Sequence, residues 1–71
     1  MCLSTVYIQS GDQRIKVMQD VAQMEYNQEG YLLIGLLGDQ KFVKGRIKSL
    51  DFVDDHTVVL EKEGNKKGGN Q

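Results

Sequence analysis

The only cysteine of this 71-residue chain is Cys2, one peptide bond from the amino end of the sequence. A thiolate there lies beside main-chain nitrogen, and beside a terminal amine if Met1 is removed. Sulfur and nitrogen ligands suit zinc, copper and nickel. A single cysteine cannot complete such a site, because tetrahedral zinc takes four ligands. A two-fold dimer would double the set, giving two Cys2 thiolates and two nitrogens.

The residue types leave the metal and its geometry open. A planar set of two sulfurs and two nitrogens suits Ni(II) or Cu(II), whereas a tetrahedral set suits zinc. The alternative is that Cys2 is a small buried apolar residue, as free cysteines often are. Chain ends are rarely anchored in a core, however, and this favours a ligand role for Cys2.

His56 is the only histidine and lies in an Asp54-Asp55-His56 turn. No second imidazole supports a metal site there, so a solvated turn residue is expected. Cys2 and His56 also lack the sequence context of a Cys-His nucleophilic pair. The sequence therefore predicts no catalytic residues and a protein that is not an enzyme.

The composition limits the remaining classes of function. A chain of this size is one small domain that gains from a metal or from self-association, and one cysteine excludes an internal disulfide. Nine basic and ten acidic residues leave no basic patch for a phosphate backbone, so nucleic acid is an unexpected partner. No segment has the pattern of a signal peptide or a membrane span. We expect a cytoplasmic protein with a reduced thiol.

Short β-strands must position Cys2. The first predicted strand, residues 3–9, alternates so that Cys2, Ser4, Val6 and Ile8 share one face. The Val6 and Ile8 face should be the inner one, which directs Cys2 toward a barrel mouth or a seam. The other predicted strands cover residues 13–18, 21–27, 30–37, 40–44, 46–53 and 57–62. Residues 21–27 are assigned to a strand in preference to a short helix.

Several side chains are assigned to a face by the same alternation. Those expected to face the core are Ile15, Val17 and Phe42, with Val43 facing outward. A bulge near Lys48 and Ser49 would bring Ile47 into phase with Leu50 and Phe52.

Residues 30–37 form the most apolar stretch, with hydrophobic side chains on both faces. One face of a small barrel meets the core, so the other face is expected to meet a second subunit. An ordinary central strand covered by loops is the alternative.

The fold predicted from these strands is all-β, an SH3-like antiparallel barrel of six to seven short strands over residues 1–62. Residues 63–71 contain no apolar side chain and are expected to form a flexible, disordered polar tail.

The chain resembles the CooT-type nickel-binding accessory proteins of carbon monoxide dehydrogenase maturation, a family also described as RNA-binding. The shared segments are Met1-Cys2 with the strand Leu3–Tyr7, Asp20-Val21, Leu36–Asp39, Gly45-Arg46-Ile47 and Val58–Glu61. The resemblance implies a homodimeric small β-barrel with Ni(II) held by paired Cys2 residues. It also implies delivery of nickel to the enzyme's nickel-iron-sulfur cluster, with that enzyme or its maturation proteins as partners.

Two other functions remain open from the sequence. A small-barrel RNA-binding protein is one, although the near-zero net charge and the few aromatic residues weigh against it. The other is an interaction module that docks a protein through residues 31–37.

Overall fold

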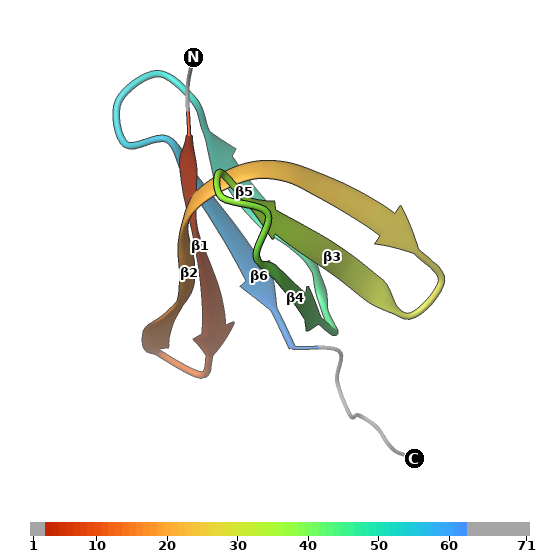
Figure 1. The fold of residues 1–71 in the computed structure, drawn as a ribbon. Helices are drawn as coiled ribbons and strands as arrows, with labels where there is room; N and C mark the ends of the chain where they lie inside the picture. Colours follow the sequence, from red (N-terminus) through yellow and green to blue (C-terminus); the bar gives the residue numbers. More distant parts are fainter. Residues whose placement is uncertain (1–2, 63–71) are drawn as a thin grey trace.

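The structure, a computed structural model, describes residues 3–62 and forms one six-stranded sheet (Figure 1). The strands are β1 (Ser4–Ser10), β2 (Gln13–Asn27), β3 (Gly30–Gly35), β4 (Gln40–Val43), β5 (Arg46–Asp51) and β6 (Thr57–Glu61). The all-β prediction is confirmed, and the six strands fall within the predicted six to seven. Met1, Cys2 and the predicted tail 63–71 lie outside the described residues. No helix in the described part is long and apolar enough to cross a membrane.

The sheet order is β4-β3-β2-β1-β6-β5, and it departs from the expected antiparallel barrel in two ways. First, β1 and β6 pair in parallel, because the chain crosses over through β2 to β5 before β6 returns beside β1. Second, the sheet does not close, because β4 and β5 each have a neighbour on one side alone. The result is a strongly curled open sheet (Figure 1).

The longest strand, β2, makes the sheet curl. The sequence predicted two strands joined by a connection at Gln19-Asp20, but β2 runs unbroken from Gln13 to Asn27. Asp20 has a φ of 56°, and shifts of register flank it on both sides. Aspartate tolerates this left-handed conformation better than most residues do. The first half of β2 therefore pairs with β1, and the second half turns away to pair with β3.

The core lies between these two halves of the sheet. Its buried members come from five strands and are Val6, Val21, Leu33, Val43, Val58 and Leu60. Each of these strands contributes the side chains that the alternation places on its inner face.

Two of the predicted core positions are wrong. Val43 is buried and Phe42 is 40% exposed, the reverse of the expectation. The register explains this, because Val43 lies opposite Tyr31, which packs against the core, and Phe42 lies opposite Leu32. Ile15 is also exposed, although Ile8, which lies opposite it, packs against the core. Val17 does pack against the core, as predicted.

The bulge predicted near Lys48 and Ser49 is confirmed. Ile47 lies opposite Leu60 and Ser49 lies opposite Val59, so Lys48 is the additional residue on β5. Just before β5, Gly45 has a φ of 150°, and a Cβ atom there would approach the Glu61 carbonyl oxygen to 2.7 Å. Glycine thus lets the chain pass from β4 to β5 close against β6.

Leu33 and Leu37 provide a matched test of this core. Leu33 is fully buried, whereas Leu37 is 91% exposed in the turn after the same strand. We expect Leu33→Ala to lower the free energy of unfolding by about 2–5 kcal/mol, because it leaves a cavity. Leu37→Ala should change it by less than about 0.5 kcal/mol. Urea unfolding followed by circular dichroism measures both, and equal effects would contradict the assigned core.

Candidate functional site

The residues that follow Cys2 are held on both sides. β1 begins at Ser4, two residues after Cys2, and lies inside the sheet between β2 and β6. Ser4 lies opposite Val21, and Thr5 lies opposite Thr57. Cys2 itself lies outside the described residues, but the strand that leads to it is not an edge strand.

The loop between β5 and β6 also supports the start of β1. The backbone N–H of Thr5 donates a hydrogen bond of 3.0 Å to the carbonyl oxygen of His56. His56 has a φ of 51° and is half-buried, so it is less solvated than the sequence predicted. The sequence separates His56 widely from Cys2, whereas the structure brings its main chain to the first residues of β1.

Asp51 shapes this loop from its first residue. Its Oδ1 accepts hydrogen bonds from the backbone N–H groups of Val53, at 3.1 Å, and Asp54, at 3.0 Å. Hydrogen bonds from the Asp54 and Val53 backbone N–H groups stabilise the charged carboxylate and lower the pKa of Asp51. The loop that supports β1 is thus organised by a carboxylate at the end of β5.

The described chain contains no complete metal site of its own. Among residues 3–62, no three His, Cys, Asp or Glu side chains converge in a way that could hold a metal ion. The Asp54-Asp55-His56 turn is therefore not a metal site by itself.

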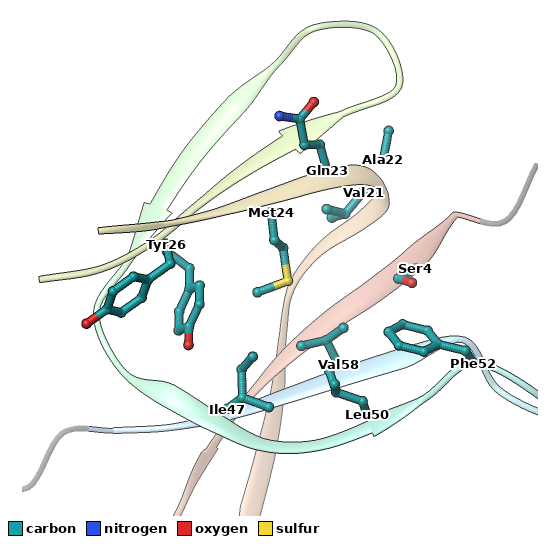
Figure 2. Close-up of a pocket in the computed structure, with 11 residues that line it drawn as sticks. Ser4, Val21, Ala22, Gln23, Met24, Tyr26, Ile47, Leu50, Phe52 and Val58 are labelled. Atoms are coloured by element: carbon teal, nitrogen blue, oxygen red, sulfur yellow. The ribbon is translucent and has the colours of Figure 1, made fainter. Parts of the chain in front are cut away.

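An apolar hollow of about 460 Å³ opens beside β1. It lies between the second half of β2 and the face of β5, as Figure 2 shows. Its eleven lining residues are Ser4, Val21, Ala22, Gln23, Met24, Tyr26, Tyr31, Ile47, Leu50, Phe52 and Val58. None of them carries a charge. Ser4 places the hollow next to the strand that leads to Cys2.

Sequence reasoning did not single out this hollow. It correctly placed Ile47, Leu50 and Phe52 on one face, but Leu50 and Phe52 remain 49% and 57% exposed because the sheet does not close over them. The segment 30–37 buries Leu33 in the core and exposes Leu36 and Leu37 at its end, and its part in a contact with a second subunit stays a prediction. The feature of the sequence that could have indicated the hollow is the excess of apolar residues after the Lys48 bulge.

Comparison with known proteins assigns the chain to a family. The model of the CO dehydrogenase accessory protein CooT matches residues 1–61. The chain belongs to the CooT family. A crystal structure assigned as the CooT of Carboxydothermus hydrogenoformans is similar to it, with a TM-score of 0.81 and 33% sequence identity. That match covers 89% of this chain and 100% of the other. No curated protein sequence matches the chain significantly.

The CooT assignment confirms the resemblance drawn from the sequence. The matched region includes the Met1-Cys2 start, the whole sheet and the β6 strand. Membership supports an accessory role in maturation of carbon monoxide dehydrogenase. The part played by Cys2 stays a prediction, because that residue lies outside the described range.

The pKa of Asp51 gives a prediction about the loop beside β1. A carboxyl group with a lowered pKa in the folded state contributes stability above its ordinary pKa and loses it as the pH falls through the lowered value. We expect the free energy of unfolding of Asp51→Asn to fall less steeply below about pH 4 than that of the native chain. Urea unfolding at a series of acid pH values measures this, and identical slopes would refute the role of the carboxylate.

Proposed function

We propose that this CooT-family protein binds Ni(II) through the Cys2 thiolates of two chains in a homodimer, and supports nickel insertion into carbon monoxide dehydrogenase. The observation that carries the proposal is the family match, which spans the Met1-Cys2 start and the sheet. An accessory family fits a non-catalytic role. The nickel ion is cargo in this proposal, passed on to the enzyme.

The chemistry of the ligands supports nickel as the cargo. Each Cys2 offers a thiolate and an adjacent nitrogen, either the terminal amine or the deprotonated Cys2 amide. Two such pairs give two sulfurs and two nitrogens, a set that suits Ni(II) when it is planar.

The described residues support a shared site in a second way. Residues 3–62 hold no group of side chains able to bind a metal ion alone. In this proposal the ligands come from Cys2, and a single thiolate needs a second copy to reach a full set. The strand that follows Cys2, β1, is paired with β2 on one side and with β6 on the other.

Replacement of the thiol tests the proposal directly. We expect Cys2→Ser to weaken Ni(II) binding by at least about 100-fold, since a hydroxyl is a poor ligand for this metal. His56→Ala is the matched control and should bind as the native chain does. Titration calorimetry should also give one nickel ion per two native chains. Unchanged affinity in Cys2→Ser would eliminate the proposal.

Proton release provides an independent measurement. The thiol, and the amide or amine beside it, must lose protons to bind metal, so binding should weaken as the pH falls. Calorimetry in two buffers with different ionisation enthalpies should give different apparent binding enthalpies. A value that does not depend on the buffer would show that no proton leaves, and would rule out thiolate ligation.

An RNA-binding role would be revealed by the same variant. Salt-dependent binding of single-stranded RNA that persists in Cys2→Ser, together with unchanged nickel affinity, would replace the metal proposal with this alternative. The described structure offers no observation that favours it.

A further inference from the structure

The second half of β2 has a free edge. Residues 23–27 pair with residues 30–34 of β3 on one side. The pairing of β2 with β1 ends earlier, where Val21 lies opposite Ser4. Within residues 3–62 no strand lies along the other side of residues 23–27, so the N–H and C=O groups that point away from β3 have no strand partner there. Such a row of backbone groups can pair with an added strand.

The hollow opens along this free edge. Gln23 and Met24 both line it, although they are neighbours in one strand. Neighbouring residues of a strand point to opposite faces, and Figure 2 shows these two side chains on opposite sides of the β2 ribbon. A cavity that both of them line therefore reaches β2 from its edge as well as from one face.

The rest of the hollow is apolar and uncharged. Ile47, Leu50 and Phe52 form the side across from β2 (Figure 2). Tyr26 and Tyr31 lie at one end, with their ring centroids 5.5 Å apart. The volume of about 460 Å³ falls within the roughly 300–1,000 Å³ that is typical of ligand pockets. The hollow therefore has room for apolar side chains of a bound segment.

Glu25 gives the free edge its charge. This residue is exposed and lies between Met24 and Tyr26 in the sequence, so it points to the face of β2 that the hollow does not cover. Its carboxylate accepts a hydrogen bond of 2.6 Å from the Gln23 amide nitrogen and makes no ion pair in the described part of the chain. A strand added at the edge would place a side chain beside Glu25, and a basic side chain there would be favourable.

We propose that the free edge of β2 and the hollow bind an extended segment of another protein, in which one basic residue lies between two apolar residues. The segment adds to residues 23–27 as a further strand. Its two apolar side chains share one face and enter the hollow beside Met24 and Tyr26, while its basic side chain lies on the other face and pairs with Glu25. The proposal does not depend on the nickel site.

Two other occupants of this surface fit less well. A second copy that paired through residues 23–27 about a two-fold axis would be centred on Glu25, and the two carboxylates would lie opposite each other, which is destabilising. Residues 63–71 of the same chain contain no apolar side chain to enter the hollow. The partner must therefore supply both the apolar side chains and the opposite charge.

The edge of β5 is a poorer place for strand addition than the edge of β2. β5 also pairs with one strand alone, but it carries the Lys48 bulge. Bulges and lysines on an edge strand oppose the pairing of a further strand. Residues 23–27 have a regular register with β3 and no such feature.

Two short capped peptides that differ at one residue test the proposal. Their central sequences are Val-Arg-Val and Val-Glu-Val, and both are flanked by threonines. We expect the arginine peptide to bind the full native chain with a dissociation constant of about 1 mM or lower, and the glutamate peptide to bind about 3-fold or more weakly. Titration followed by NMR of the amide groups measures this, with shifts expected in residues 22–26 and 46–52. Shifts confined to other strands, or no binding at about 5 mM peptide, would overturn the proposal.

A change of charge on the protein should reverse the preference. Glu25→Lys should bind the glutamate peptide more tightly than the arginine peptide, because the like charges are now on the other pair. Glu29→Lys makes the same change in the exposed turn after β2 and should keep the preference for arginine. Circular dichroism shows that both variants fold. An unchanged preference in Glu25→Lys would refute the charge pairing.

Methylation of the peptide backbone tests strand addition on the native chain, and so it remains informative if Glu25→Lys folds poorly. Only alternate N–H groups of an added strand face its neighbour. Of two arginine peptides methylated on the two alternate sets of backbone nitrogens, one should bind like the parent peptide and the other should not bind. Equal binding of the two would show that the segment does not pair as a strand.

Two further measurements separate this proposal from the others. Cys2→Ser should bind both peptides as the native chain does, whatever its affinity for nickel, because the described edge does not include that residue. Hydrogen exchange of the native chain without peptide should show no added protection in residues 22–26 as its own concentration rises. Protection there would assign the edge to a second copy and overturn the proposal.

Discussion

The bend of β2 at Asp20 is the constraint on which the rest of the structure depends. A straight strand of this length would pair with β1 and β3 in one flat layer and leave the apolar face open to water. The left-handed backbone at Asp20 and the register shifts around it turn the second half of β2 across the first. The backbone N–H of Leu36 donates a hydrogen bond of 3.0 Å to the Asp20 carbonyl oxygen, and this holds the end of β3 against the bend. The two halves of the sheet can then enclose a core.

The same bend accounts for the hollow. The core side chains Val6, Leu33, Val58 and Leu60 fill the space where the two halves of the sheet approach most closely. Toward β5 the sheet ends without meeting β4, so the lining at Leu50 and Phe52 has no strand to cover it. A domain of this size has too few residues to add another layer, and small domains often complete their cores through a partner or a metal.

The loop from Asp51 to His56 connects the hollow to the beginning of the chain. Asp51 fixes the loop through its carboxylate, Phe52 extends from it into the hollow, and the His56 carbonyl oxygen accepts the N–H of Thr5. The Asp51 carboxylate and the His56 main chain thus connect this loop to the first residues of β1. His56 contributes through its main chain, which is why its imidazole gave no useful signal in the sequence.

The sequence by itself determined the all-β class, the approximate positions of most strands, the bulge at Lys48 and the family, because alternation and turn residues are local properties. It did not determine that β2 is one bent strand, since Gln19-Asp20 looks like any polar connection until β1 and β3 pair on either side of it. The assignment of Phe42 and Val43 failed for a related reason, because the core face of a four-residue strand is set by its register with β3. The hollow, the support of β1 by the His56 loop and the open edge of the sheet were decided by tertiary structure alone. Each depends on contacts between segments far apart in the chain, and no local pattern records them.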